Sequence, residues 1–131
     1  MLLWLPMASL AQSFAGLGSD AEGFSLPEPN PTFQFPSDDG SHPDFRIEWW
    51  YLTANLKSAD GKDYGLQWTL FRTALAPTDE EGWSSPQPWM GHAAVTTSDA
   101  HFVTERLARG GIGQADVTLN PFEAWIDEWT F

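Results

Sequence analysis

The chain has 131 residues, with 18 acidic residues against 6 basic ones and a formal net charge of −12. This length suits one domain of ordinary size, and the charge excludes a protein that holds nucleic acid through clusters of lysine and arginine. The sequence has no cysteine, which excludes disulfides and thiolate metal sites. Eight tryptophans and nine phenylalanines supply ample apolar area for a core.

Residues 1–11 form a short apolar run that closes on small residues, as the end of a secretory signal peptide does, with a cut after Ala11. A buried apolar arm is the alternative, because no positive charge precedes Arg46. No transmembrane span is predicted, since a span requires about 20 apolar residues and polar residues follow directly at Gln12 and Ser13. We therefore predict a periplasmic or secreted protein.

Residues 12–40 are rich in proline and glycine and are predicted to form an extended arm that ends in a turn. Residues 41–131 then form the predicted β domain. Its first two strands are expected at 46–56 and 64–74, where aromatic and β-branched residues are frequent. The Asp60-Gly61 pair between them supplies the positive φ angles of a tight hairpin.

A loop over 76–88 and a third strand over 90–97 are expected next. Residues 100–109 fit either a short helix or an irregular edge, and strands over 116–120 and 123–131 follow around a bend at Pro121. The last strand would leave an open aromatic edge, so we expect the chain to be part of a longer protein. Strands separated by turns predict an antiparallel sandwich or barrel.

Adjacent side chains on a strand point to opposite faces, so Trp49 and Trp50 are expected to serve two different surfaces. Arg46, Glu48 and Trp50 share one face, and Ile47, Trp49 and Tyr51 share the other. One tryptophan is expected to point into the interior of a barrel, and its neighbour to pack outside it.

Four stretches of the sequence resemble the AttH/CrtC family, the lipocalin-like proteins that include carotenoid 1,2-hydratases. They are GSHPDFRIEWWYLTANL at 40–56, YGLQWTLFR at 64–72, MGHAAVT at 90–96 and ERLARGG at 105–111. The resemblance spans about residues 35 to 129. It implies an all-β, antiparallel lipocalin or calycin-like barrel that is incomplete in this chain, the first of two tandem barrels. The C-terminal barrel of the full-length protein would then be a partner.

The resemblance also implies a hydrophobic small molecule, an isoprenoid or lipid, as the ligand, and hydration of an isoprenoid C=C bond as the activity. Such a hydro-lyase needs a proton donor, a surface that tolerates a carbocation and a water, but no cofactor and no metal. We predict Glu48 as the acid and His92 as a proton shuttle. The predicted ligand-binding residues are Trp50, Trp68, Gln67 and Arg72.

Structural roles compete with each of these assignments. Glu48 can instead form an ion pair with Arg46, Arg72 or Arg106, and such networks are common. His92 can be a hydrogen-bonded core histidine, and a turn at His42-Pro43-Asp44 that orders the start of the strand is favoured over a metal site. A secreted carrier that binds a lipid without transforming it is the alternative function, and a scaffold for the other barrel is a third.

Overall fold

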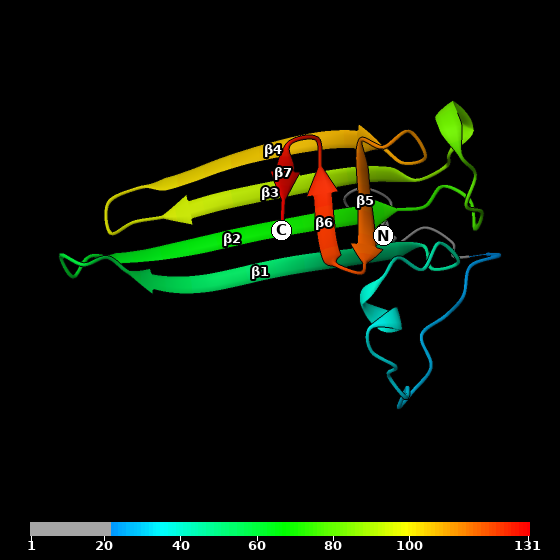
Figure 1. Ribbon diagram of the computed structural model, residues 1–131, viewed down its shortest axis with the longest axis horizontal. Coiled ribbons are helices and arrows are strands. Elements are labelled where there is room, and N and C mark those ends of the chain that lie inside the picture. The colour runs from blue at the N-terminus through cyan, green and yellow to red at the C-terminus, as the bar shows by residue number, and fades with distance from the viewer. Residues whose placement is uncertain (1–21) are drawn as a thin grey trace, which may run out of the picture.

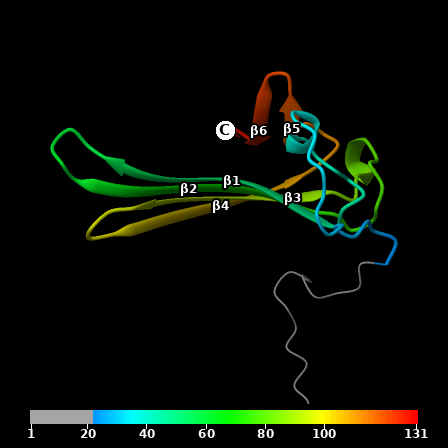
Figure 2. The same cartoon turned by 90° about the horizontal axis from the view of Figure 1, so that it is seen from below.

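The structure is a computed structural model that describes residues 22–131, so the predicted signal segment lies outside the described residues (Figures 1 and 2). Two short 3-10 turns, η2 at Ser37–Asp39 and η3 at Gly82–Ser84, accompany seven strands. The strands are β1 Ile47–Lys57, β2 Asp63–Thr73, β3 Pro88–Thr96, β4 His101–Arg109, β5 Ala115–Leu119, β6 Phe122–Ile126 and β7 Trp129–Thr130.

Strands β1 to β4 form one antiparallel sheet in the order β1-β2-β3-β4. The predicted hairpin is present: β1 pairs with β2 from Ile47 opposite Thr73 to Lys57 opposite Asp63. Gly61 turns the chain with a φ of 87°, a conformation that glycine adopts without a steric penalty. Consecutive strands are neighbours throughout this sheet, even across the long loop between β2 and β3.

Strands β5, β6 and β7 form a second sheet that crosses one half of the first (Figure 1) and lies on one of its faces (Figure 2). We call this the inner face of the β1–β4 sheet and the opposite side its outer face. The core lies between the two sheets, and β3 approaches β6 closely at Gly91. The buried core residues are Leu70, Trp89, Ala115, Val117, Ala124 and Ile126.

Two predicted elements were wrong. Residues 101–109 form neither a helix nor an irregular segment: they are the regular edge strand β4, which pairs with β3 from Pro88 opposite Arg109 to Thr96 opposite His101. Residues 123–131 are two strands, since Asp127 adopts a positive φ of 50° and turns the chain between β6 and β7. In both cases long-range pairing overrides an ambiguous local pattern.

The prediction of an all-β, antiparallel and incomplete lipocalin-like fold is confirmed. The described strands form two sheets that pack across each other, and over residues 22–131 they do not close into a barrel. Within the same residues, no helix has the length and apolar character that crossing a membrane requires.

The close approach of the two sheets makes a glycine replacement informative. A Cβ atom at Gly91 would lie 2.7 Å from Cγ2 of Ile126, a side chain with no exposed surface. Gly91→Ala is therefore expected to lower the free energy of unfolding by about 1–3 kcal/mol, through overpacking. Gly65→Ala on β2 is the control, because its Cβ would meet Thr96 at 3.4 Å, an ordinary contact. Urea denaturation of both variants checks this, and equal effects would contradict it.

Candidate functional site

The strand register separates the six predicted site residues onto two faces. Glu48 lies opposite Arg72 and Trp50 opposite Leu70, which is a core residue, so these side chains belong to the inner face together with Trp68. Gln67 and His92 occupy the alternate positions and belong to the outer face. The structure therefore brings Glu48, Trp50, Trp68 and Arg72 to one side of the sheet and places the other two on the far side.

Arg72 is a buried cation whose whole guanidinium group is hydrogen-bonded. Only 1% of the residue is exposed. Its Nε and Nη2 donate to Oε2 of Glu48 at 3.0 and 2.7 Å, and its Nη1 donates to the side-chain oxygen of Gln87. Nη2 also donates to the carbonyls of His42 and Phe45, at 2.7 and 2.9 Å. Such pairing is what makes a buried charge tolerable.

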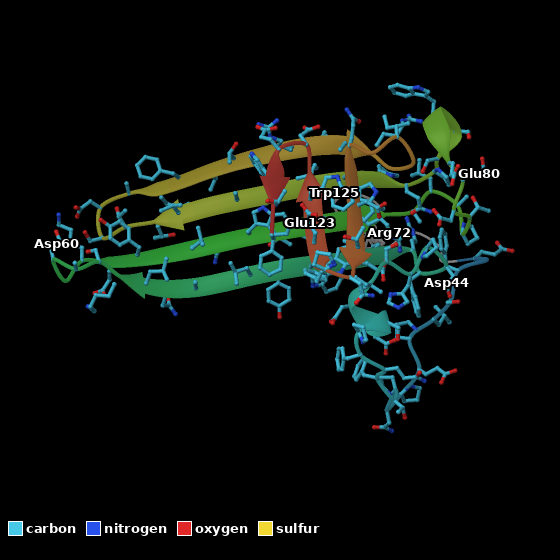
Figure 3. The ribbon with its side chains drawn as sticks, viewed as in Figure 1. Asp44, Asp60, Arg72, Glu80, Glu123 and Trp125 are labelled. Atoms are coloured by element: carbon cyan, nitrogen blue, oxygen red, sulfur yellow. The ribbon has the colours of Figure 1, made fainter. Side chains whose placement is uncertain are left out.

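Glu48 is held on both oxygens by this network. Besides Arg72, the backbone N–H of His42 donates to Oε2 at 2.8 Å, and Nδ1 of His42 lies 2.7 Å from Oε1. The carboxylate thus ties the His42-Pro43-Asp44 turn to the sheet, at the end where Figure 3 labels Arg72 and Asp44. This is one of the ion pairs that the sequence allowed as a structural alternative. A catalytic role for Glu48 stays a prediction.

The two inner-face tryptophans have different surroundings. Trp50 stacks on the core residue Trp89, with ring centroids 5.6 Å apart, and its indole N–H donates to the carbonyl of Asp39 at 2.8 Å. Trp68 stacks on Phe131 at 5.4 Å, and Phe131 meets the edge of Phe122 at 5.9 Å. Trp50 is therefore part of the packed core, and Trp68 lies where the β5–β7 sheet stops covering the inner face.

Beyond Trp68 the inner face remains apolar but uncovered. Phe102 is 63% exposed, Leu56 is 50% exposed and Val95 is 39% exposed, and half-buried Leu52 and Leu66 lie between them on the same face. We call these five residues the open apolar surface. Phe102 was not predicted from the sequence, because residues 100–109 were assigned to a helix or an irregular edge. The pairing of Phe102 with Val95 is set by the alignment of β4 with β3 in the folded structure.

On the outer face, His92 and Gln67 line a shallow groove with Thr69, His101, Val103 and Glu105. His92 lies 3.9 Å from the carboxylate of Glu105, and its ring meets the edge of Phe71 at a centroid distance of 5.4 Å. The sheet backbone separates His92 from Glu48, so the two predicted catalytic residues cannot contact one reacting atom. Over the described residues, no three histidine or acidic side chains are grouped to hold a metal ion.

The Arg72 network generates a stability prediction. Arg72→Met is expected to lower the free energy of unfolding by about 3–5 kcal/mol, because it leaves the mostly buried carboxylate of Glu48 without its cation. Lys57→Met removes an exposed ion pair with Asp63. It is expected to change the free energy of unfolding by only about 0–1 kcal/mol. Urea denaturation measures both, and a small loss for Arg72→Met would show that the network does not hold the fold.

The comparisons with known proteins agree with this architecture. The AttH-like family description matches residues 26–131. Among solved structures, the chain is similar to a protein of Nitrosomonas europaea described as AttH, with a TM-score of 0.66 and 30% sequence identity. That similarity covers 82% of this chain and 33% of the other, so this chain spans about a third of that protein's length. No curated protein matches. The resemblance seen in the sequence is confirmed, and the chain belongs to the AttH-like family.

Proposed function

We propose that this domain binds a hydrophobic small molecule on the open apolar surface of its inner face. One observation carries the proposal: the β1–β4 sheet continues past the β5–β7 sheet, and its inner face stays apolar where nothing in the described chain covers it. Contiguous exposed apolar surface of this kind marks binding sites. Covering it with a ligand would remove that surface from water, at about 25 cal/mol per Å².

The composition of the domain supports an uncharged ligand. The chain has a formal net charge of −12, which disfavours anions such as phosphate-bearing compounds. The open apolar surface adjoins Trp68, whose ring stacks with Phe131 and extends the aromatic wall. An isoprenoid or a neutral lipid suits a surface built from aliphatic and aromatic groups. In this proposal the domain acts as a secreted carrier.

Hydration of an isoprenoid C=C bond is the second candidate function. It is supported by Glu48 and Trp50 sharing the inner face, as an acid beside a cation-stabilising ring would. The hydrogen bonds of Glu48 weigh against it, because its carboxylate accepts from Arg72 and from the backbone of His42. We therefore rank simple binding above hydration.

Binding predicts saturable quenching of tryptophan fluorescence when the chain is titrated with all-trans-retinol or geranylgeraniol. Phe102→Ser is expected to weaken binding by about tenfold or more, the affinity that a buried phenylalanine side chain supplies. Leu107→Ser is the matched control: it removes another exposed apolar residue of β4, 78% exposed, but from the outer face. Equal weakening by the two variants, or no saturable quenching, would rule out the inner-face site.

Hydration is tested by extracting the bound isoprenoid after incubation and measuring its mass. A carrier returns the ligand unchanged, whereas a hydratase returns it with one added water. If product forms in the full-length protein, Glu48→Gln decides the role of Glu48, since the amide keeps an acceptor for Arg72 but cannot donate a carboxylic proton. Unchanged product formation in that variant would remove Glu48 from the mechanism.

A further inference from the structure

The outer face of the β1–β4 sheet, opposite the β5–β7 sheet (Figure 2), has two hollows that meet at Gln67. One is the groove beside His92, with a volume of about 550 Å³. The other, of about 720 Å³, lies next to it, toward the turns that join β1 to β2 and β3 to β4. Its outer-face lining residues are Thr53, Asn55, Gly65, Gln67 and Thr96. We call the two hollows together the outer trough, and it lies on the side of the sheet opposite the open apolar surface.

The outer trough is rich in uncharged hydrogen-bonding side chains that the described chain leaves without a partner. Among residues 22–131, no hydrogen bond is formed by the side chains of Thr53, Asn55, Gln67 and Thr69, which line it. An amide offers both donors and an acceptor, and a hydroxyl offers one donor and two lone pairs. The outer trough therefore suits a ligand whose own groups both donate and accept hydrogen bonds, as hydroxyl groups do.

The outer trough has a low floor because small residues lie among longer ones. Gly65 has no side chain, and Ala94, which lies opposite Gln67, has only a methyl group. The outer-face positions from Tyr51 to Asn55 extend about 14 Å along β1, and the four strands of the sheet span about 14 Å from edge to edge. A ligand made of several six-membered rings fits this area.

Two exposed aromatic side chains of β1 stand beside the outer trough. Tyr51 is 65% exposed and Trp49 is 56% exposed, and Tyr51 lies opposite Thr69 of the trough. Neither ring packs against another ring within the described residues. The solvated face of an antiparallel sheet is ordinarily polar, which accounts for the threonines and amides but not for two neighbouring exposed rings. Exposed aromatic surface beside polar groups marks a binding site.

The charged groups that line the outer trough each have a partner of opposite kind, so the trough does not favour a charged ligand. The net charge of −12 further disfavours anions such as acidic polysaccharides. A neutral ligand remains. The pairs are Lys62 with Asp60 at 2.9 Å, Asp63 with Lys57 at 2.5 Å and Glu105 with His92 at 3.9 Å.

We propose that the outer trough binds a neutral oligosaccharide. A pyranose ring has an apolar C–H face and a rim of hydroxyl groups. The C–H face packs against Tyr51, and Trp49 extends this stacking surface along β1. The hydroxyl groups exchange hydrogen bonds with the side-chain amides of Gln67 and Asn55. Gln67 and His92, predicted from the sequence to serve the hydrophobic ligand, thereby gain a role on the face where the strand register places them. This inference does not depend on the isoprenoid site.

The test follows the side-chain amide resonances of Gln67 and Asn55 in the ¹⁵N-labelled full chain, assigned by their loss in Gln67→Glu and Asn55→Asp. The chain is titrated separately with cellopentaose and maltopentaose. A saturable shift with at least one of them is expected, and the tighter response identifies whether an extended or a coiled glucan is preferred. Pentagalacturonic acid, which carries carboxylates on the same ring framework, is expected to bind more weakly. Tighter binding of this acid would overturn the proposal, and so would no saturable shift with either neutral sugar.

Variants assign the sugar to one face of the sheet. Tyr51→Ala removes the stacking surface and is expected to weaken binding of the preferred sugar by about tenfold. Gln67→Ala removes hydrogen bonds and is expected to weaken it by about fivefold to tenfold. Both side chains are exposed, so neither change is expected to lower the unfolding midpoint.

Phe102→Ser is the matched control for Tyr51→Ala. It removes a ring of similar exposure, 63%, but from the inner face, and is expected to leave sugar binding unchanged. Equal weakening of sugar binding by Tyr51→Ala and Phe102→Ser would show that the sugar does not bind on the outer face.

Discussion

The hydrogen bonds of the buried Arg72 guanidinium group hold together the end of the molecule where β1 begins. The residue is 1% exposed. Its hydrogen bonds reach the start of β1 through Glu48, the preceding turn through the carbonyls of His42 and Phe45, and the loop before β3 through Gln87. Segments that are far apart in the sequence therefore meet at one charge. Losing any acceptor leaves part of a buried cation unpaired, and this cost makes the arrangement specific.

A difference in strand length between the two sheets leaves part of the inner face uncovered by the described residues. Strands β1 and β2 have 11 residues each, whereas β5 and β6 have 5. The shorter sheet crosses the longer one and covers only the half that holds the core. The remaining half keeps the apolar inner-face pattern of a barrel wall, and within residues 22–131 no second layer covers it. The proposed hydrophobic site is thus a consequence of the architecture, and it lies away from the Arg72 network.

The adjacent tryptophans Trp49 and Trp50 show how one strand places side chains on both faces of the sheet. Trp50 is stacked on Trp89 in the core, while Trp49 is 56% exposed on the outer face. The same alternation places His92 on the side opposite Glu48, so the two residues predicted to share an acid–base role are divided by the sheet. The inner face combines a salt-bridged end with an apolar end. These two regions have distinct chemistry because they lie at opposite ends of the same strands.

The sequence by itself determined the all-β class, the first hairpin with its turn at Asp60-Gly61, the opposed faces of Trp49 and Trp50, and the family. Each of these depends on local alternation, turn chemistry or a run of adjacent residues, which are properties of short segments. It could not decide whether 101–109 was a strand, because the spacing of its apolar residues fits two structures until β3 pairs with it. The hydrogen-bond partners of Glu48 and the extent to which the β5–β7 sheet covers the inner face were decided only by the tertiary structure. Each depends on which distant segments pack together, and a single sequence does not encode those distances in any local pattern.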